Sequence, residues 1–449
     1  MTELDLLKNA DHKAGVYTDN IGQRPAFPSE QAIACLSAFE QPLSEQRRPP
    51  TETLAMLDKL GSEATVASNG GRYFGFVLGA SLPVAAAAER LALAWDQCAS
   101  SAVTSPVAHA IERAAARLVL EALDLPAESA VNFGTSASAC GLVCLHAARR
   151  ALLKRKGWDL DRQGLTGAPP IRVVLTELAH ITVIKALRVL GFGLNHLEFA
   201  KVDQYGRLDP QTLPDLDADT ILCLQAGEVN TGECDPFAEL IPRAKAAGAW
   251  VHVDGAFGLW ARASSQTRHL TNGIELADSW TTDGHKWLNT PYDGAIGICR
   301  DAVALAEAMN SNAVYSSSGM DSQENLGLEF SRRARGIPIW AALHSLGRQG
   351  LAEQGDRYVR LAKRLAQGLE DNGFTLLNRV VLNQVLVRLD SDQATQAVRE
   401  QAISSGEIWF GQSVWRGRPA LRLSVCSWRT TEQDIDTAVA ILAAAKAGI

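Results

Sequence analysis

The run Trp250-Val251-His252-Val253-Asp254 decides the fold, because it has the pattern of a short buried strand that directly follows a helix. The preceding helix is predicted over 236–247, with Asp235 as its N-cap, Pro236 at its first position and Gly248 just past its end. A strand joined so closely to a helix is typical of α/β proteins with a parallel sheet.

The same alternation extends in both directions along the chain. Further apolar strand-like runs lie at 130–133, 171–175, 221–224 and 294–299, with helical patterns between them. We therefore predict a large domain built on a mostly parallel sheet, followed by a smaller α+β domain with strands at 384–389 and 420–425. The predicted segments are an N-terminal arm (1–65), the large domain (66–309), a mobile active-site loop and connector (310–336) and the small domain (337–449). The stretch 310–325, which is rich in Ser and Gly, is predicted to be a surface loop without secondary structure.

Length and composition favour an intracellular protein that acts on small molecules. The 449 residues exceed the roughly 250–300 at which one core stops growing, so more than one packed unit is expected. The net charge of −7 argues against binding to nucleic acid or to an anionic membrane. Eight dispersed cysteines, a charged N-terminus and an apolar stretch at 82–95 that is too short to span a bilayer indicate a soluble cytoplasmic protein.

A lysine and an acid suggest the chemistry. Lys286, in the run Thr281-Thr282-Asp283-Gly284-His285-Lys286-Trp287, follows the strand that ends at Asp254. An amine holds the aldehyde of pyridoxal 5'-phosphate as a Schiff base, and a carboxylate keeps the pyridine nitrogen protonated so that the ring accepts electrons. Asp254 ends its strand at the carboxyl edge of the sheet, where α/β proteins bind ligands, although an acid there also commonly caps a neighbouring helix.

The segment between the first predicted strand and the helical run 142–153 is a candidate phosphate site. Small and hydroxyl residues that open a helix expose backbone N–H groups to an anion, and the helix dipole adds to the attraction. The candidates are Thr135, Ser136, Ala137 and Ser138. An ordinary helix cap is the alternative, and the presence of Lys286 favours the phosphate.

Three further side chains are candidates for contact with the cofactor ring or phosphate. His180 starts a predicted helix and is positioned to stack on the ring, whereas a histidine bonded to local backbone is the commoner case. Ala256 leaves room for a flat ring, and His285, beside the lysine, is a candidate donor to the phosphate or a space-filling residue.

Several segments together resemble the pyridoxal-dependent group II decarboxylase family, which includes aromatic amino acid and glutamate decarboxylases. The resemblance lies in Thr135-Ser136-Ala137-Ser138, Ala179-His180, His252-Val253-Asp254-Gly255-Ala256, Asp283-Gly284-His285-Lys286-Trp287-Leu288 and Ser331-Arg332-Arg333-Ala334-Arg335. It implies the fold type I, aspartate aminotransferase-like architecture with a seven-stranded sheet, and a homodimer with active sites at the subunit interface. It also implies a stacking role for His180, pairing of Asp254 with the pyridine nitrogen and a Schiff base at Lys286. Tyr73 and Phe74, in a segment that is similar to the family's aromatic pocket, are then expected to wall the substrate site.

Two departures from the family pattern bear on the reaction. Ala139 stands where the family usually has a glutamate at the helix start. The family also carries a loop tyrosine that protonates the α-carbon after carbon dioxide leaves, and 320–330 contains no tyrosine. The nearest tyrosine is Tyr315, which lies before that run.

We predict a carboxy-lyase that decarboxylates an L-amino acid, with Lys286, His180 and Tyr315 as catalytic residues. The alternatives on the same scaffold are an aldehyde synthase, a carbon–carbon lyase or aldolase, and an aminotransferase, because the bond that breaks depends on how the pocket orients the substrate. Arg429 is a candidate to bind a substrate carboxylate, which would favour the reactions that retain that group, and a surface or helix-cap role is the alternative. The non-enzymatic alternative is a ligand sensor built on the same fold, and such a sensor would normally carry a basic DNA-binding module.

Overall fold

The structure is a computed structural model that describes residues 2–310 and 319–449. The chain divides into two compact units. The large unit comprises Gly79–Lys363 and Leu377–Val385, and the small unit comprises Met1–Leu78, Arg364–Leu376 and Leu386–Ile449. Each unit has its own sheet and is described by itself.

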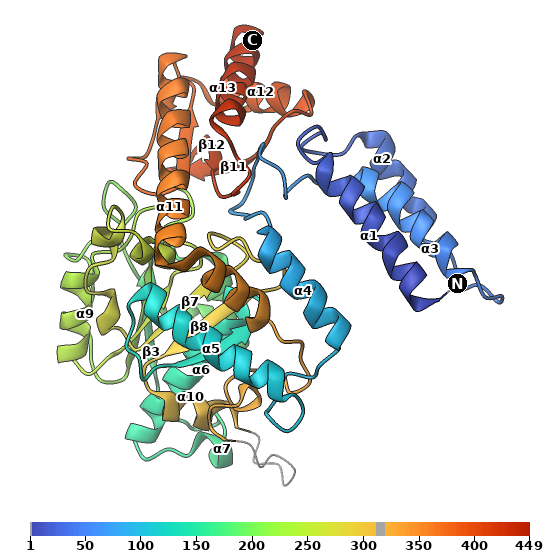
Figure 1. Ribbon diagram of the computed structural model, residues 1–449. Coiled ribbons are helices and arrows are strands. Elements are labelled where there is room, and N and C mark those ends of the chain that lie inside the picture. Colours follow the sequence, from blue (N-terminus) through green and yellow to red (C-terminus); the bar gives the residue numbers. More distant parts are fainter. Residues whose placement is uncertain (1, 311–318) are drawn as a thin grey trace. The chain divides into compact units, whose positions relative to one another are not determined.

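The large unit is built on a seven-stranded sheet with the strand order β2-β8-β7-β6-β5-β3-β4 (Figure 1). The pairs from β7 through β4 are parallel, and β8 is antiparallel to both of its neighbours. The strands are β2 (Ala130–Gly134), β3 (Arg172–Thr176), β4 (Leu197–Ala200), β5 (Thr220–Gln225), β6 (Trp250–Asp254), β7 (Ser279–Asp283) and β8 (Ala295–Cys299). The mostly parallel sheet predicted from the sequence is therefore confirmed.

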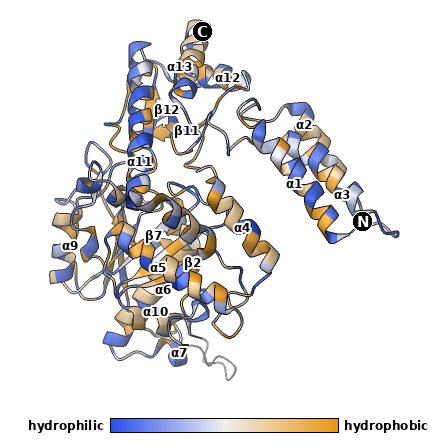
Figure 2. Cartoon of the chain, in the orientation of Figure 1, coloured by the Kyte–Doolittle hydropathy of each residue, from blue (hydrophilic) through white to orange (hydrophobic). Residues whose placement is uncertain are grey.

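Helices before, between and after the strands supply the rest of the large unit's core. They are α4 (Pro83–Trp95), α5 (Pro106–Leu123), α6 (Ala137–Arg155), α7 (Leu160–Gln163), α8 (Ile181–Val189), α9 (Phe237–Ala246) and α10 (Ala302–Met309), and α11 (Gly336–Asp371) begins here with a kink at Gly347. Every residue of β5, β7 and β8 is buried, as expected for strands covered on both faces. Figure 2 accordingly colours the central strands towards the hydrophobic end of its scale. Cys140 and Cys144 lie buried on α6.

The small unit combines N-terminal helices with a five-stranded sheet of order β1-β11-β12-β10-β9. Its strands are β1 (Tyr73–Phe74), β9 (Thr375–Leu376), β10 (Gln384–Arg388, which begins in the large unit), β11 (Trp409–Trp415) and β12 (Arg418–Ser424). Its helices are α1 (Glu3–Asp19), α2 (Glu30–Ala34), α3 (Pro50–Met56), α12 (Asp392–Ser404) and α13 (Glu432–Ala447). The two strands predicted near the C-terminus correspond to β10 and β12.

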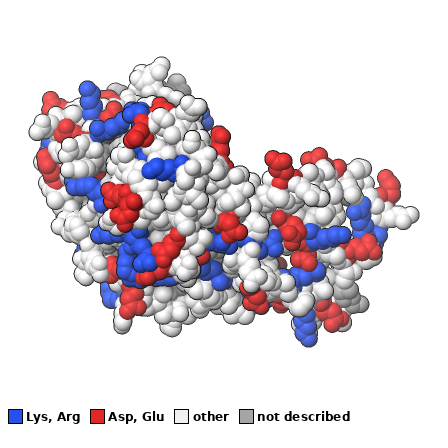
Figure 3. All heavy atoms as spheres, turned by 90° about the horizontal axis from the view of Figure 1, so that it is seen from above, with Lys and Arg blue, Asp and Glu red and all other residues white. Residues whose placement is uncertain are grey.

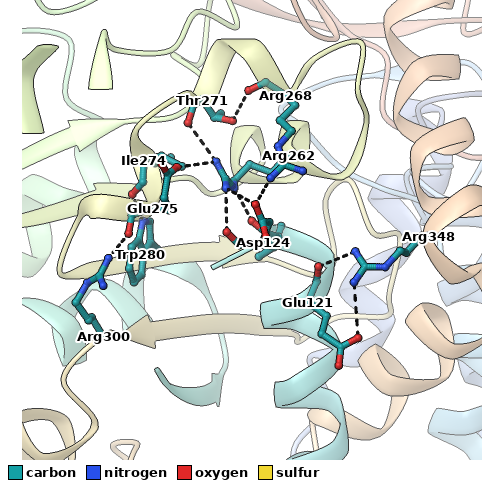
Figure 4. Close-up of polar contacts among 11 residues, drawn as sticks. Glu121, Asp124, Arg262, Arg268, Thr271, Ile274, Glu275, Trp280, Arg300 and Arg348 are labelled. Atoms are coloured by element: carbon teal, nitrogen blue, oxygen red, sulfur yellow. Dashed lines mark hydrogen bonds and ion pairs between the residues drawn. The ribbon is translucent and has the colours of Figure 1, made fainter. Parts of the chain in front are cut away.

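A buried arginine closes the C-terminal end of α5 in the large unit (Figure 4). The side chain of Arg262 is 3% exposed, and its guanidinium donates to the backbone carbonyls of Leu123 and Asp124. The same group pairs with Glu275 at 3.2 Å and donates to Thr271 O at 3.3 Å. The last carbonyls of a helix lack partners within the helix, so Arg262 supplies them from outside.

A second buried pair joins α5 to the segment that leads into α11. Glu112 and Arg332 form a two-point ion pair at 2.6 and 2.8 Å, with side chains 1% and 2% exposed. Arg332 also donates to Ala99 O at 2.8 Å and to Phe133 O at 2.9 Å. Glu112 accepts a further bond from Gly336 N at 2.9 Å. Good geometry and complete bonding of this kind are what a buried ion pair requires.

The prediction of a surface loop over 310–325 is wrong for its last residues. Ser322, Gln323, Glu324 and Asn325 are buried, and Gln323–Asn325 forms a turn of 3-10 helix. The side-chain amide of Gln323 donates to Val131 O and accepts from Phe133 N, both at 3.0 Å, so it pairs with the outer edge of β2. Because Val131 and Phe133 are far from Gln323 in the sequence, polarity alone gave no sign of this docking.

The predicted cap of α9 is also wrong. Pro236 occupies the N-cap position, and no side chain caps the helix. The Asp235 carboxylate instead accepts from Leu208 N and Gln225 N, each at 2.7 Å, and so ties β5 to the chain before it. Burial raises the pKa of Asp235 to about 6, well above its usual value.

Charges are mixed on the visible face of the molecule, where Figure 3 shows blue and red spheres side by side rather than one extended basic patch. Within the described ranges, none of the helices has both the length and the apolar character needed to cross a membrane. The same residues contain no group of three or more His, Cys, Asp or Glu side chains placed to hold a metal ion.

Candidate active site

The candidate site lies in the large unit, at the carboxyl ends of β6 and β7 and at the start of α6. In the parallel register of β6 and β7, Asp254 lies beside Thr281. Asp283 ends β7, and Lys286 follows it in the turn that leads out of the strand. Parallel strands that end at one sheet edge bring their following residues together, so the predicted lysine and acid meet as expected.

One carboxylate connects the lysine to the start of α6. Asp283 Oδ2 lies 3.1 Å from Lys286 Nζ, and Asp283 Oδ1 accepts from Ala137 N at 2.7 Å. The Asp283 side chain is 4% exposed, whereas that of Lys286 is 21% exposed. The amine is therefore reachable from solvent, while the carboxylate that holds it is enclosed.

His285 has a fixed tautomer next to this pair. Its Nδ1 lies 2.9 Å from Gly294 O, which only accepts, so Nδ1 carries the proton. Its Nε2 then faces Asp283 Oδ1 at 3.7 Å, and its ring stacks on Tyr292 with centroids 4.1 Å apart. Burial lowers the pKa of His285, although the Asp283 charge opposes the effect.

Asp254 is surrounded by groups that act on its charge. Burial raises the pKa of the Asp254 carboxyl, and the charges of His180 and Lys286 act in the opposite direction. Asp254 Oδ1 accepts from Ala256 N at 3.2 Å, and Ala256 O accepts from Asp283 N at 2.8 Å. This short chain of backbone bonds fixes the end of β6 against the end of β7.

His180 is the N-cap of α8 and is partly buried. Its Nδ1 lies 2.7 Å from Thr182 Oγ1, a local contact that orients the imidazole at the helix start. The charge of His180 acts on Asp254, so the structure brings these two predicted residues into one neighbourhood.

The start of α6 is accessible. The five residues 135–139 are partly exposed between the buried end of β2 and the buried Cys140. Ser136 is the N-cap, and its Oγ accepts from Ala139 N at 3.2 Å, as in an ordinary cap. The segment therefore combines the two alternatives considered from the sequence, because it is a capped helix start and is also accessible.

Gly79 contacts the lysine turn from the other side. Gly79 N donates to His285 O at 3.1 Å, and a Cβ at this position would lie 2.1 Å from Lys286 O and 2.7 Å from Asn289 Nδ2. No side chain fits there without moving the turn, so this position needs glycine because of the close approach. The sequence alone does not reveal this requirement.

Four predicted residues do not belong to the described part of the large unit. Tyr73, Phe74 and Arg429 belong to the small unit, and Tyr315 lies outside the described residues. Phe74 is fully buried, and Tyr73 is 7% exposed and stacks on Trp409 with centroids 5.0 Å apart. Their predicted contact with substrate stays a prediction.

Arg429 has the character expected of a carboxylate-binding residue, although its role also stays a prediction. Its guanidinium lies over the Trp428 ring at 4.5 Å, and its buried Nε has no hydrogen-bond partner within 2–310 and 319–449. Partial burial lowers the pKa of the Arg429 guanidinium.

The large-unit residues fit pyridoxal phosphate. Lys286 offers a partly exposed amine, and α6 offers an accessible helix start for a phosphate. Asp254 offers a carboxylate whose pKa is raised by burial, an effect that the nearby charges of His180 and Lys286 oppose. Sequence reasoning missed Asp283, whose contact with Ala137 joins residues 146 positions apart. Its one signal was an acid at the end of a strand, three residues before the lysine.

Comparison with known proteins agrees with this chemistry. The family model described as "Pyridoxal-dependent decarboxylase conserved domain" matches residues 72–390, most of the chain. "Tryptophan decarboxylase 1" of Oryza sativa subsp. japonica is 28% identical over 82% of this chain and 78% of its own length. "Aromatic-L-amino-acid decarboxylase" of Bacillus atrophaeus is 25% identical over 78% of this chain and 73% of its own. "Phenylacetaldehyde synthase" of Arabidopsis thaliana is 26% identical over 76% and 74%.

Solved structures share the fold. The crystal structure of Oryza sativa TDC with PLP and tryptamine superposes with a TM-score of 0.91 at 22% identity, covering 100% of this chain and 99% of that one. Mouse CSAD in apo form gives a TM-score of 0.89 at 19% identity, covering 98% of each chain. The fold type I architecture expected from the sequence is thus confirmed.

Proposed function

The chain belongs to the pyridoxal-dependent decarboxylase family, and we propose that its cofactor, pyridoxal 5'-phosphate, is bound through Lys286. The protein is an enzyme that decarboxylates an amino acid. The observation that supports this residue assignment is the meeting of the Lys286 amine, the Asp254 carboxylate and the α6 start at one edge of the sheet.

Each side chain has a separate task in the proposed mechanism. When bound, the cofactor supplies a ring that takes up the electrons of the breaking bond. Asp254 holds a proton on the ring nitrogen, because its buried carboxylate gains from an adjacent positive charge. His180, the N-cap of α8, would stack on the cofactor ring, and the α6 start at Thr135, Ser136, Ala137 and Ser138 would hold the phosphate through backbone N–H groups. The small side chain of Ala256 would leave room for the ring, and His285, next to Lys286 in the turn, would contact the phosphate.

We propose an aromatic L-amino acid as the substrate. Two relatives from distant organisms, the rice and Bacillus proteins, carry names of aromatic amino acid decarboxylases. Tyr73 and Phe74 are proposed to wall the substrate pocket, and Arg429 to meet a substrate carboxylate.

The second candidate is oxidative synthesis of an aldehyde from the same substrate, in which dioxygen takes up two electrons to give hydrogen peroxide, water supplies the aldehyde oxygen, and carbon dioxide and ammonia are released. It is favoured by the absence of tyrosine from 320–330, a run in which Ser322–Asn325 are buried. It is also favoured by the relative named phenylacetaldehyde synthase. Under the leading proposal, Tyr315 or the freed Lys286 amine delivers the proton to the α-carbon. Tyr315→Phe should then shift the product from amine towards aldehyde, and an unchanged product ratio would remove Tyr315 from this role.

The direct test of the proposed lysine is its replacement. Lys286→Ala should lose the visible absorbance of bound cofactor and the covalent mass added after borohydride reduction, while Lys154→Ala, an exposed lysine on α6, should keep both. Incubating the wild type with aromatic amino acids should release carbon dioxide and the matching amine. Aldehyde with ammonia would favour the second candidate, and a protein that binds no cofactor would overturn the proposal.

We also propose a homodimer, because apolar side chains gather on exposed helices. No residue of α1, α2 or α3 is buried, and Leu4, Leu7 and Val16 of α1 are 58%, 41% and 50% exposed. On α4, Leu91 and Leu93 are 55% and 72% exposed. Leu93→Glu should lower the mass measured by light scattering to that of one chain, whereas Leu194→Glu, at a separate exposed position, should not.

The segment boundaries and location complete the proposal. The arm over 1–65 is proposed to serve dimer formation, 66–309 to bind the cofactor, 310–336 to supply an active-site loop and connector, of which 311–318 lie outside the described residues, and 337–449 to form the small domain. All eight cysteines are free, which supports a reducing compartment such as the cytoplasm.

A further inference from the structure

The Asp283 carboxylate contacts both of the groups that the cofactor is proposed to use. Its Oδ1 accepts from Ala137 N, the first residue of α6, at 2.7 Å, and its Oδ2 lies 3.1 Å from Lys286 Nζ. With 4% of the side chain exposed, the carboxylate has little water to screen its charge. An anion of the protein thus lies at the position where the helix start attracts anions.

The surroundings leave Asp283 with limited compensation for a second anion. Its partners are one backbone N–H, the Lys286 ammonium and the Nε2 side of His285 at 3.7 Å. Because His285 Nδ1 donates to Gly294 O, the neutral ring presents a lone pair at Nε2 and adds no positive charge there. A phosphate ester that approaches Ala137 N therefore meets a like charge.

We infer that Asp283 is a positioning residue that competes with the cofactor phosphate for the start of α6 and thereby limits how tightly the enzyme holds its cofactor. The inference rests on the proposed site, in which Lys286 binds the aldehyde and α6 the phosphate. It goes further by assigning to Asp283 a role opposed to cofactor retention. The same carboxylate orients the Lys286 amine until the cofactor's charge displaces it.

The test separates the phosphate from the rest of the cofactor. Dissociation constants of pyridoxal phosphate and of pyridoxal, which lacks the phosphate, are measured on apoenzyme prepared by dialysis against cysteine. The ratio of the pyridoxal dissociation constant to the pyridoxal phosphate dissociation constant reports the contribution of the phosphate alone. Asp283→Asn keeps an oxygen that accepts from Ala137 N and removes the charge, so the ratio should rise about tenfold.

Two further variants sharpen the result. Asp301→Asn makes the same change at the N-cap of α10, where Asp301 accepts from Ala304 N, and should leave the ratio unchanged. Ala137→Pro removes the contested N–H at the first helical position, where proline is tolerated. In that background, Asp283→Asn should raise the ratio by clearly less than in the wild type.

The outcomes distinguish this inference from the proposed function. A wild type that binds neither ligand contradicts the proposed site, whereas normal binding with an unchanged or lower ratio in Asp283→Asn overturns only the role of Asp283. If Asp283→Asn does not accumulate as folded protein, Asp283→Ser tests the same loss of charge. The wild type gives an independent measurement: inorganic phosphate should speed the attachment of pyridoxal to Lys286 by displacing Asp283, and the absence of acceleration counts against the inference.

Discussion

Replacing Glu112 by methionine should destabilise the large unit strongly, because it leaves the guanidinium of Arg332 buried without its counter-charge. Both side chains are at most 2% exposed, and the pair is bonded at two points. Removing one partner of such a pair costs about 3–5 kcal/mol. Gly336 N also loses its acceptor, which adds to the cost.

The double variant Glu112→Met with Arg332→Met tests the cause. It removes both charges and leaves the carbonyls of Ala99 and Phe133 without their donor. Its destabilisation should therefore be smaller than the sum of the two single effects by about 3 kcal/mol or more, since neither charge is left alone.

The assay is urea unfolding followed by tryptophan fluorescence, at one protein concentration and with saturating cofactor, so that differences between midpoints report differences in stability. Arg364 and Asp436 provide the control, because they form the same two-point geometry at 2.8 and 2.8 Å with both side chains about half exposed. Asp436→Met should leave the midpoint nearly unchanged. Additive effects of the two Glu112 and Arg332 variants, or a loss below about 1 kcal/mol for Glu112→Met, would refute the reasoning.

Three other results are expected. Arg262→Met should lower the free energy of unfolding by about 2–4 kcal/mol, measured in the same urea assay, because the backbone carbonyls of Leu123 and Asp124 at the end of α5 and that of Thr271 lose their donor (Figure 4). Burial lowers the pKa of His252 and of His146 to about 4, so the neutral form of each favours the folded state. Their contribution to the free energy of unfolding should be complete above pH 6.5 and should be lost as the pH falls towards 4. In unfolding curves taken between pH 6.5 and pH 4, His252→Gln should show a smaller loss of stability than the wild type. Gly79→Ala should weaken cofactor binding at least tenfold in a fluorescence titration, because the added Cβ displaces the Lys286 turn, and wild-type affinity would contradict that contact.

Much of the fold was predictable because local patterns agree with the tertiary structure. Apolar runs separated by helical patterns gave the parallel sheet, and the rule that ligands bind at the carboxyl ends of strands placed Asp254 near Lys286. The start of α6 was recognisable from its small and hydroxyl residues.

The contacts that escaped prediction join residues that are distant in the sequence. Asp283 and Ala137 are 146 positions apart, and Glu112 and Arg332 are 220 positions apart, so no local pattern links them. Asp235 was expected to cap the next helix, but two buried backbone donors of Leu208 and Gln225 claim its carboxylate. The polar composition of Ser322–Asn325 predicted an exposed loop, but these residues are buried, because polar side chains can be buried when they find hydrogen-bond partners.

The docking of Gln323 has a consequence for the chain before it is fully folded. While its amide occupies Val131 O and Phe133 N, those two atoms cannot recruit a strand from another molecule. In a newly synthesised chain β8, the sheet partner of β2, precedes Gln323, so until Gln323 docks the rim of β2 is open to strands of other molecules. Aggregation during expression should accordingly begin at this rim and depend on how soon Gln323 docks on β2.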